Sequence, residues 1–355
     1  MKIAAQFSRY FVGVLFIISG VIKLNDPVGT QIKLEEYFEV FGTHFMVPFA
    51  LYLAVFVCVL EVALGVAVLL WYRMKYTSMA LLGLIIFFTF LTFYSAYFNK
   101  VTDCGCFGDA LKLKPWQSFW KDIVLLVLIM VINASQKSIK SNTSNILGDS
   151  LVVIFTAIAL GFAIYCIQHL SVIDFRAYKV GADIRALMQP SCAAKYKYVM
   201  TRSGQEYEFE KYPTDTTYTF KEMVLLNPEC MPKITDYNIW SDEGDYTKET
   251  FNGKKIIITV LNTSKASINN IDKIKNLIKD AEGTDIQVIF ITASDKQSFE
   301  DFRHEYALAA PYYYADAVVI KTMIRSNPGI IYLENGVIKG KWHENDTPNI
   351  NNLPK

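Results

Sequence analysis

Five long apolar segments in the first 170 residues constrain the fold of this chain more than any other feature. A helix that crosses the ~30 Å hydrocarbon core of a bilayer needs roughly 20 residues. The second, third and fifth segments reach that length, and the first and fourth reach it when a turn of amphipathic residues is added. We therefore predict five membrane-spanning helices. Their apolar cores are Tyr10–Ile22, Phe45–Tyr72, Ser78–Tyr97, Phe119–Asn133 and Ser150–Ile167.

The second half of the chain has the composition of a water-soluble protein. Hydrophobic residues make up 52% of the 355 residues and charged residues only 19%, but the apolar excess lies before about residue 170. The net charge of +1 gives no indication of nucleic-acid binding. We expect a multi-domain membrane protein that contacts the lipid bilayer and a protein partner, and no nucleic acid.

The order of the spans predicts which parts of the chain share a side of the membrane. No small-x-small cleavage site follows the first segment, so we interpret it as a retained span. Lysines and arginines set orientation, but they are equally numerous on the two faces. Two spans separate the loop Thr102–Asp109 from everything after residue 170, so both lie on one face. We place that face in the periplasm, outside a bacterial inner membrane, because paired cysteines persist more readily there than in the cytosol.

Two of the six cysteines, Cys104 and Cys106, lie one residue apart in this loop. A disulfide between them would close a very small ring and would be easily reduced. Gly105 permits the backbone angles that such a ring needs. A redox-active pair and a purely structural loop are both open interpretations. A zinc site is the third, although no histidine lies close in sequence and no four-ligand set is visible, so we predict no metal site.

The first 135 residues resemble a known family. The sequence Arg9–Pro27, the segment Leu60–Gly65 and the loop Asp103–Asp109, which Pro115-Trp116 and Lys121-Asp122 follow, are similar to parts of the DoxX/MauE family of small membrane proteins. The likeness covers roughly residues 5–135. It implies an α-helical four-helix membrane bundle over residues 1–135, to which residues 136–170 add a fifth transmembrane helix.

The resemblance also implies chemistry. Members of the family are linked to sulfur-compound oxidation with quinones and to disulfide maturation of periplasmic enzymes. A membrane quinone is the one cofactor that this suggests, since the sequence shows no haem, flavin or nucleotide motif.

Glu61 lies inside the second span, where a carboxylate is costly unless it is neutral, paired or beside a wet cavity. Ser19 lies at a similar depth in the first span, and Lys23 lies on the same face one turn farther along. We predict that Glu61 hydrogen-bonds to the Ser19/Lys23 face. The contact either fixes helix packing or serves a proton or a ligand. Cys58 shares the face of Glu61 and, like Cys166, is typical of a small hydrophobic residue.

Residues 171–235 are predicted to form a linker with a β-hairpin. Alternating residues in Tyr196–Met200 and Tyr207–Phe209 flank the turn Arg202-Ser203-Gly204. Cys192 and Cys230 flank this region and can pair in an oxidising compartment, although spacing alone does not prove a structural disulfide.

Residues 236–355 alternate between strand and helix patterns and end in a hairpin at Asn335-Gly336, which implies an α/β fold. With the segments Ile239–Gly244 and Phe251–Lys254, this order resembles a TlpA-like or peroxiredoxin-like thioredoxin domain. The predicted elements are strand Ile256–Leu261, helix Ile268–Ala281, strand Ile286–Thr292, helix Lys296–Ala309, strand Tyr312–Tyr314 and the hairpin strands Ile330–Leu333 and Val337–Lys341.

The resemblance implies a cis bond between Asn327 and Pro328, where the family keeps its cis-proline. The chain departs from the family at the first helix, where Ser264-Lys265-Ala266-Ser267 replaces Cys-x-x-Cys. A serine cannot form a disulfide, so we predict that Ser264 or Ser267 is a helix N-cap. We also expect the closing helix to be short or absent in Asn349–Lys355, and a domain that has lost thiol exchange but binds a partner.

Two functions remain open. In the first, the chain is a membrane thiol–disulfide oxidoreductase: Cys104 and Cys106 exchange electrons between an external thiol partner and a quinone, and Glu61 handles protons. In the second, the chain has no activity and is a subunit or scaffold of an inner-membrane complex, with the thioredoxin-like domain as its binding module.

Overall fold

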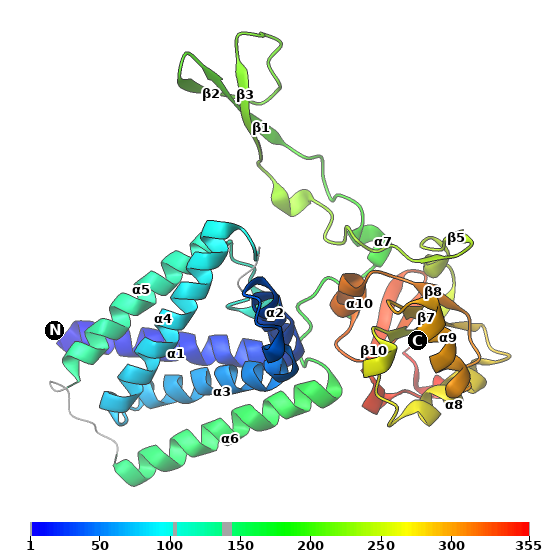
Figure 1. Cartoon of the computed structure of the whole chain (residues 1–355), viewed down its shortest axis with the longest axis horizontal. Helices are drawn as coiled ribbons and strands as arrows, with labels where there is room; N and C mark the ends of the chain where they lie inside the picture. Colours follow the sequence, from blue (N-terminus) through cyan, green and yellow to red (C-terminus); the bar gives the residue numbers. More distant parts are fainter. Residues whose placement is uncertain (1, 102–104, 137–143, 355) are drawn as a thin grey trace. The chain divides into compact units, whose positions relative to one another are not determined.

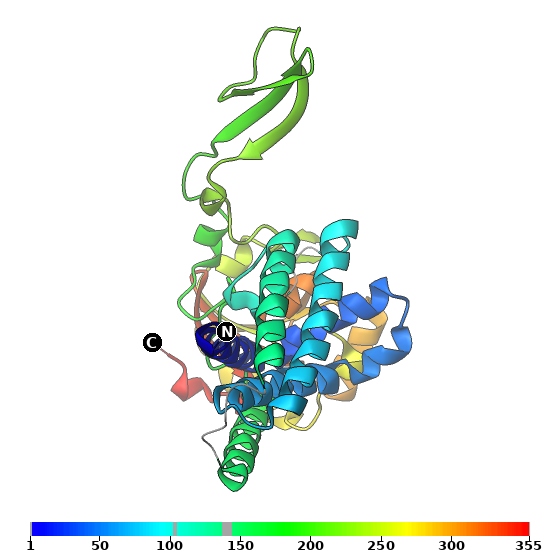
Figure 2. The same ribbon diagram turned by 90° about the vertical axis from the view of Figure 1, so that its left-hand side faces the viewer.

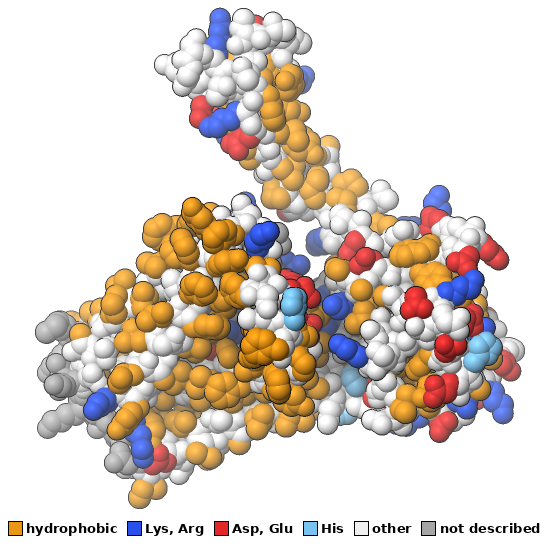
Figure 3. Space-filling model, viewed as in Figure 1, with side chains coloured by type: hydrophobic (Ala, Val, Ile, Leu, Met, Phe, Trp, Pro, Cys, Tyr) orange, Lys and Arg blue, Asp and Glu red, His pale blue; other side chains and the backbone are white. Residues whose placement is uncertain are grey.

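The fold is seen in a computed structural model that describes residues 2–101, 105–136 and 144–354 (Figure 1). It contains two compact units, Met1–Phe175 and Arg176–Lys355. Apolar side chains cover the helices of the first unit, whereas acidic and basic side chains are frequent on the second (Figure 3). Cys104 lies outside the described residues.

Five helices in the described ranges are long and apolar enough to cross a membrane, as predicted. They are α1 (Lys2–Asn25), α3 (Ala50–Leu69), α4 (Met74–Phe98), α5 (Pro115–Ser135) and α6 (Asn145–His169). The first and fourth spans are extended beyond their apolar cores, as expected. The second apolar segment differs from the prediction, because it begins with the 3-10 turn η1 (His44–Phe49) and α3 ends before Trp71.

Glycines set the distance between α1 and α3, which pack closely along their length. A Cβ atom at Gly65 would lie 2.8 Å from the carbonyl oxygen of Gly13, and one at Gly20 would lie 2.9 Å from that of Cys58. Small residues let membrane helices approach backbone to backbone. This contact brings the polar face of α1 against Glu61. The other close pair, α4 and α5, lies side by side in both views (Figures 1 and 2).

Helix α2 (Pro27–Val40) was not predicted. Asp26 caps it by accepting a hydrogen bond from the amide of Gly29 at 2.8 Å, and Pro27 occupies the first helical position. Asn25, at the end of α1, pairs through its side-chain amide with the backbone of Ile173 at 2.7 and 3.0 Å. These contacts fix the end of the first span and the start of α2.

The predicted hairpin is present in residues 171–235 and carries a third strand that was not predicted. Strands β1 (Tyr196–Arg202), β2 (Gln205–Phe209) and β3 (Thr219–Leu225) form an antiparallel sheet in the order β2-β1-β3. Ser203 and Gly204 make the turn with positive φ angles of 51° and 78°. A disulfide joins Cys192 and Cys230, whose Cα atoms are 5.1 Å apart, and so closes the base of this sheet.

The C-terminal residues form a seven-stranded sheet in the order β10-β9-β6-β7-β8-β4-β5. Strand β6, inside the sheet, is parallel to β7 and antiparallel to β9, and β10 pairs with β9 across the Asn335-Gly336 turn. This order is that of a thioredoxin-like domain, as expected. The strands are β4 (Trp240–Ser241), β5 (Gly244–Asp245), β6 (Lys254–Val260), β7 (Ile286–Thr292), β8 (Tyr312–Tyr314), β9 (Gly329–Glu334) and β10 (Val337–His343).

Helices cover both faces of this sheet. Helices α8 (Ile271–Ala281) and α9 (Lys296–Glu305) share one buried cluster with alternate residues of β6 and β9. Helix α10 (Ala317–Met323), which was not predicted, packs against β7, and a short helix α7 (Ile184–Leu187) precedes the disulfide region. Up to residue 354, where the described part of the chain ends, the closing segment holds the 3-10 turn η7 (Ile350–Asn352) and no longer helix, as expected.

The predicted N-cap at Ser264 or Ser267 is wrong. Helix α8 begins at Ile271, three residues later than expected, and Asn270 is its N-cap residue. Ser264 lies in the 3-10 turn η5 (Thr263–Lys265), and Ser267 lies between the two elements. The helix starts late because the chain first hydrogen-bonds to the segment before Pro328, and the Asn327–Pro328 bond is cis, as predicted.

Candidate functional site

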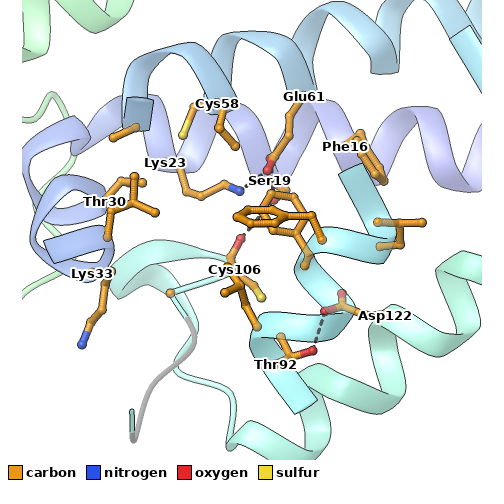
Figure 4. Close-up of a pocket in the computed structure, with 18 of the residues that line it drawn as sticks. Phe16, Ser19, Lys23, Thr30, Lys33, Cys58, Glu61, Thr92, Cys106 and Asp122 are labelled. Atoms are coloured by element: carbon orange, nitrogen blue, oxygen red, sulfur yellow. Dashed lines mark hydrogen bonds and ion pairs between the residues drawn. The ribbon is translucent and has the colours of Figure 1, made fainter. Parts of the chain in front are cut away.

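A cavity of about 90 Å³ lies inside the helical unit (Figure 4). Residues of α1, α2, α3, α4 and α5 and of the Cys106 loop line it. Its walls are mostly apolar and aromatic, and include Phe16, Phe87 and Phe88. A few polar groups converge on it from different helices, which is the composition of a small-molecule site.

The predicted contact of Glu61 is confirmed. Ser19 Oγ lies 3.1 Å from Glu61 Oε2, and Lys23 forms an ion pair with Glu61 Oε1. Both charged side chains are buried, with 7% and 2% of their surface exposed. The Lys23 ammonium also lies 5.1 Å from the centre of the Phe88 ring. A buried charge requires such partners, because removal of one leaves the other uncompensated.

A second ion pair lines the same cavity from α5. Lys121 Nζ lies 2.8 Å from Asp122 Oδ1, and Thr92 on α4 donates a hydrogen bond to Asp122 Oδ2 at 3.1 Å. Asp122 is almost fully buried. Sequence reasoning noticed Lys121-Asp122 only as part of the resemblance and missed Thr92. The sequence feature that could have identified this pair is Asp122 itself, an acidic residue inside the fourth apolar segment.

Cys106 reaches this cavity from the loop. Its carbonyl oxygen accepts a hydrogen bond from Ser19 at 3.0 Å, so one hydroxyl touches both Glu61 and the cysteine loop. Lys23 and Lys121 line the same cavity as Cys106. Positive charge beside a sulfur stabilises the thiolate, which is the reactive form.

Helix α2 closes one side of the cavity with residues that the sequence did not single out as functional. Thr30, Lys33 and Tyr37 line it, and the aliphatic part of Lys33 packs near Gly105. Cys58 also lines the cavity, on the face of Glu61 as predicted, whereas Cys166 lies in a buried position on α6.

In the thioredoxin-like domain, internal hydrogen bonds occupy the place of the missing cysteines. The amide of Ser267 donates to the carbonyl of Asn327 at 2.8 Å, and its hydroxyl donates to Glu344 at 2.8 Å. The Asn327 side chain bonds to the backbone of Leu261 and Asn262 at 3.0 and 2.9 Å. These bonds fix the loop beside the cis-proline and leave no thiol there.

Within the described ranges, no three His, Cys, Asp or Glu side chains gather as metal ligands. The polar groups of the site are two acid–base pairs, Lys23–Glu61 and Lys121–Asp122, which line an apolar cavity next to Cys106. Such a site can hold a flat apolar molecule, donate hydrogen bonds to it and move protons.

Residues 1–134 match the family model of methylamine utilisation protein MauE. The chain has a MauE-like membrane part. Among solved structures, the chain is similar to a thioredoxin-like protein from Bacteroides caccae, at 8% identity over 80% of this chain and 77% of that chain, with a TM-score of 0.22. No curated protein matches the chain. The MauE-like part holds the cavity and both ion pairs, and the thioredoxin-like assignment rests on the strand order given above.

Proposed function

We propose that the chain is a membrane thiol–disulfide oxidoreductase that passes electrons from a thiol partner, through Cys104 and Cys106, to a membrane quinone. One observation carries this proposal: the loop with Cys106 lines a cavity inside the MauE-like bundle, beside the buried Lys23–Glu61 ion pair and the Lys121–Asp122 pair, whose carboxylate is buried. A structural loop would not need charged groups buried at its inner side, where each is costly.

The exchange balances in two steps. In the first, a partner dithiol reduces the Cys104–Cys106 disulfide, and the partner becomes a disulfide. In the second, the two loop thiols are oxidised back to the disulfide and lose two electrons and two protons. A quinone bound in the cavity would take these electrons and protons and leave as quinol.

The cavity residues fit such a ligand. Phe16, Phe87 and Phe88 supply apolar ring contacts, and Lys23 supplies a hydrogen-bond donor for a carbonyl oxygen. Glu61 accepts and releases a proton between the cysteine loop and the cavity, because Ser19 links it to Cys106. Lys121 stabilises the thiolate of the loop.

The thioredoxin-like domain binds the thiol partner without chemistry of its own, because Ser267 and its neighbours replace the cysteines. We place the domain and the cysteine loop together in the periplasm, outside an inner membrane. The partner is a protein of the cell envelope whose cysteines are oxidised to a disulfide there.

The test follows the redox state of the loop in intact cells. A Cys58→Ser/Cys166→Ser variant keeps only the loop pair and the Cys192–Cys230 pair, so thiol labelling before and after quinone depletion counts reduced loop cysteines. We expect the loop pair to become reduced on depletion, while Cys192–Cys230 stays oxidised as an internal reference. One fixed state of the loop under both conditions would contradict the proposal.

A second candidate function is a scaffold without catalysis. The hydrogen-bonded Ser267–Asn327 loop favours it, because a domain that keeps its fold without its thiols is typical of a binding module. In that case Cys104→Ser would leave the cell envelope unaffected, while removal of residues 236–355 would not. Under the oxidoreductase proposal, both changes abolish function.

A further inference from the structure

The hydroxyl of Ser19 lies between two acceptors. Its oxygen is 3.1 Å from Glu61 Oε2 and 3.0 Å from the carbonyl oxygen of Cys106 (Figure 4). A serine hydroxyl carries one hydrogen and can donate only one full hydrogen bond, although it can accept two. An ionised carboxylate and a carbonyl cannot donate, so they compete for that hydrogen.

The protonation state of Glu61 decides the competition. When Glu61 is ionised, its charge attracts the Ser19 hydrogen, because hydrogen bonds to charged acceptors are the stronger ones. The bond to Cys106 is then lost. When Glu61 is protonated, it donates to Ser19 Oγ, and Ser19 donates its own hydrogen to Cys106. Both contacts of Ser19 Oγ, at 3.1 and 3.0 Å, are then hydrogen bonds at the same time.

We propose that Ser19 is a positioning residue that couples the proton on Glu61 to the cysteine loop: a protonated Glu61 holds the Cys106 loop on the cavity, and an ionised Glu61 releases it. The inference rests on the proposed function, because it makes the accessibility of the loop thiols depend on the proton that Glu61 holds. The loop lies on the cavity while a proton is held there, and becomes open to an external thiol partner once that proton leaves.

Other charged and titratable groups face Glu61 across the cavity. Lys23 on α1 is its direct ion-pair partner. Helix α4 contributes apolar side chains and Thr92. The remaining titratable groups on the cavity wall are Lys33 and Tyr37 from α2, Cys58 from α3, Cys106 from the loop, and Lys121 and Asp122 from α5.

The test measures how fast iodoacetamide alkylates Cys106 in the full chain in proteoliposomes. A Cys58→Ser/Cys104→Ser/Cys166→Ser background leaves Cys106 as the reactive thiol, because Cys192 and Cys230 are joined. This background cannot form the loop disulfide and so cannot turn over. The result therefore stays distinguishable from failure of the oxidoreductase proposal.

Two substitutions give opposite results. At the acidic end of the pH range, where the parent loop is held, Ser19→Ala removes the bond and should raise the alkylation rate about five- to tenfold, the effect of one hydrogen bond. At the alkaline end, where the parent loop is released, Glu61→Gln places an amide donor where the protonated carboxyl would be, so it should hold the loop and lower the rate. Ser19→Thr keeps the hydroxyl and should stay close to the parent. A purely structural role would raise the rate in both Ser19→Ala and Glu61→Gln and would overturn the proposal.

The pH profile gives a second criterion. The ratio of the Ser19→Ala rate to the parent rate should be largest at the acidic end of the profile and should fall toward one at the alkaline end, because only a protonated Glu61 holds the loop. A constant ratio would overturn the proposal. If Glu61→Gln does not fold, Lys23→Met replaces it, because an unpaired Glu61 takes up a proton and should also slow alkylation; faster alkylation would count against the proposal.

Discussion

Lys255 stands out among single residues because it is a lysine on the central strand of the soluble sheet with only 5% of its surface exposed. Its ammonium reaches the carbonyl of Asn252. Burial lowers the pKa of Lys255 below its ordinary value, and Glu249 offsets this only in part. The charged form is therefore unfavourable in the folded state.

Replacing Lys255 with methionine should stabilise the soluble unit. The folded pKa lies below the unfolded pKa, so the unfolded state binds more protons in the window between them, and the stability of the parent rises with pH through that window. The gain in the free energy of unfolding of Lys255→Met is therefore complete at neutral pH and becomes smaller as the pH approaches the ordinary pKa of lysine. Hydrogen exchange of the β6 amides in the full chain should slow about fivefold at pH 7, roughly 1 kcal/mol.

Lys254→Met is the matched control. Lys254 is the preceding residue on the same strand and forms an exposed ion pair with Asp285 at 2.8 Å. Exposed ion pairs contribute little to stability, so the hydrogen exchange of the β6 amides should change little in Lys254→Met. Equal slowing in both variants would show that added apolar surface, rather than the buried ammonium, is responsible.

The sequence predicts some of the site residues for identifiable reasons. Helical periodicity and depth are enough to bring Ser19 and Lys23 to Glu61, because both helices are long and their ends are recognisable. The contact of Thr92 with Asp122 has no such signal, since it depends on how α4 pairs with α5. Ser267 was misplaced because its hydrogen bonds to Asn327 and Glu344 join residues more than 55 positions apart.

Among the helices, the contact between α1 and α3 carries the site, and Gly65 is the glycine of this contact at which an added Cβ would come closest to the backbone of the facing helix. A Cβ there would lie 2.7 Å from Ile17 Cγ1 and 2.8 Å from the carbonyl oxygen of Gly13. Gly65→Ala must therefore push the helices apart, and such overpacking costs about 1–3 kcal/mol. We expect a lower melting temperature of the full chain in detergent and faster alkylation of Cys106.

Gly83→Ala on α4 and Gly161→Ala on α6 test whether the effect comes from the contact. A Cβ at either position meets no atom within 4 Å. Both changes should be neutral or slightly stabilising, since alanine is the better helix former by up to about 1 kcal/mol. If all three variants lose stability alike, close approach of α1 and α3 is not the reason for Gly65.

The elements that sequence reasoning missed share a physical cause. Helix α2 has no continuous apolar face, and only the Asp26-Pro27 start marks it. Strand β3 is exposed along most of its length, so it lacks the alternation that a half-buried strand shows. Helix α10 is short, and β-branched residues follow its first residue, Ala317. The position of each of these elements depends on tertiary contacts. Strands β7 and β8, in contrast, were predicted residue for residue, because the local sequence pattern indicates them.

For the chain as a whole, the number of spans between two segments predicts whether they share a side of the membrane. Helices α5 and α6 lie between the cysteine loop and the soluble unit, so we expect two crossings to return the chain to the same side. The proposed exchange with an external thiol partner requires this, because the partner must reach Cys106 while bound to the thioredoxin-like domain. The arrangement depends on α6, the least buried of the five spans.

Single cysteines in a background without Cys58, Cys104, Cys106 and Cys166 test this arrangement. Lys112 in the loop and Asp272 on α8 have 71% and 90% of their side chains exposed, and Lys75 lies at the start of α4, on the opposite side. A membrane-impermeant maleimide added to spheroplasts should label Lys112→Cys and Asp272→Cys, and should label Lys75→Cys only after lysis. If Lys112→Cys and Asp272→Cys are labelled from opposite sides of the membrane, both proposed functions of the loop are wrong. If both are labelled only after lysis, the loop and the soluble unit share a side, but that side is the cytosol.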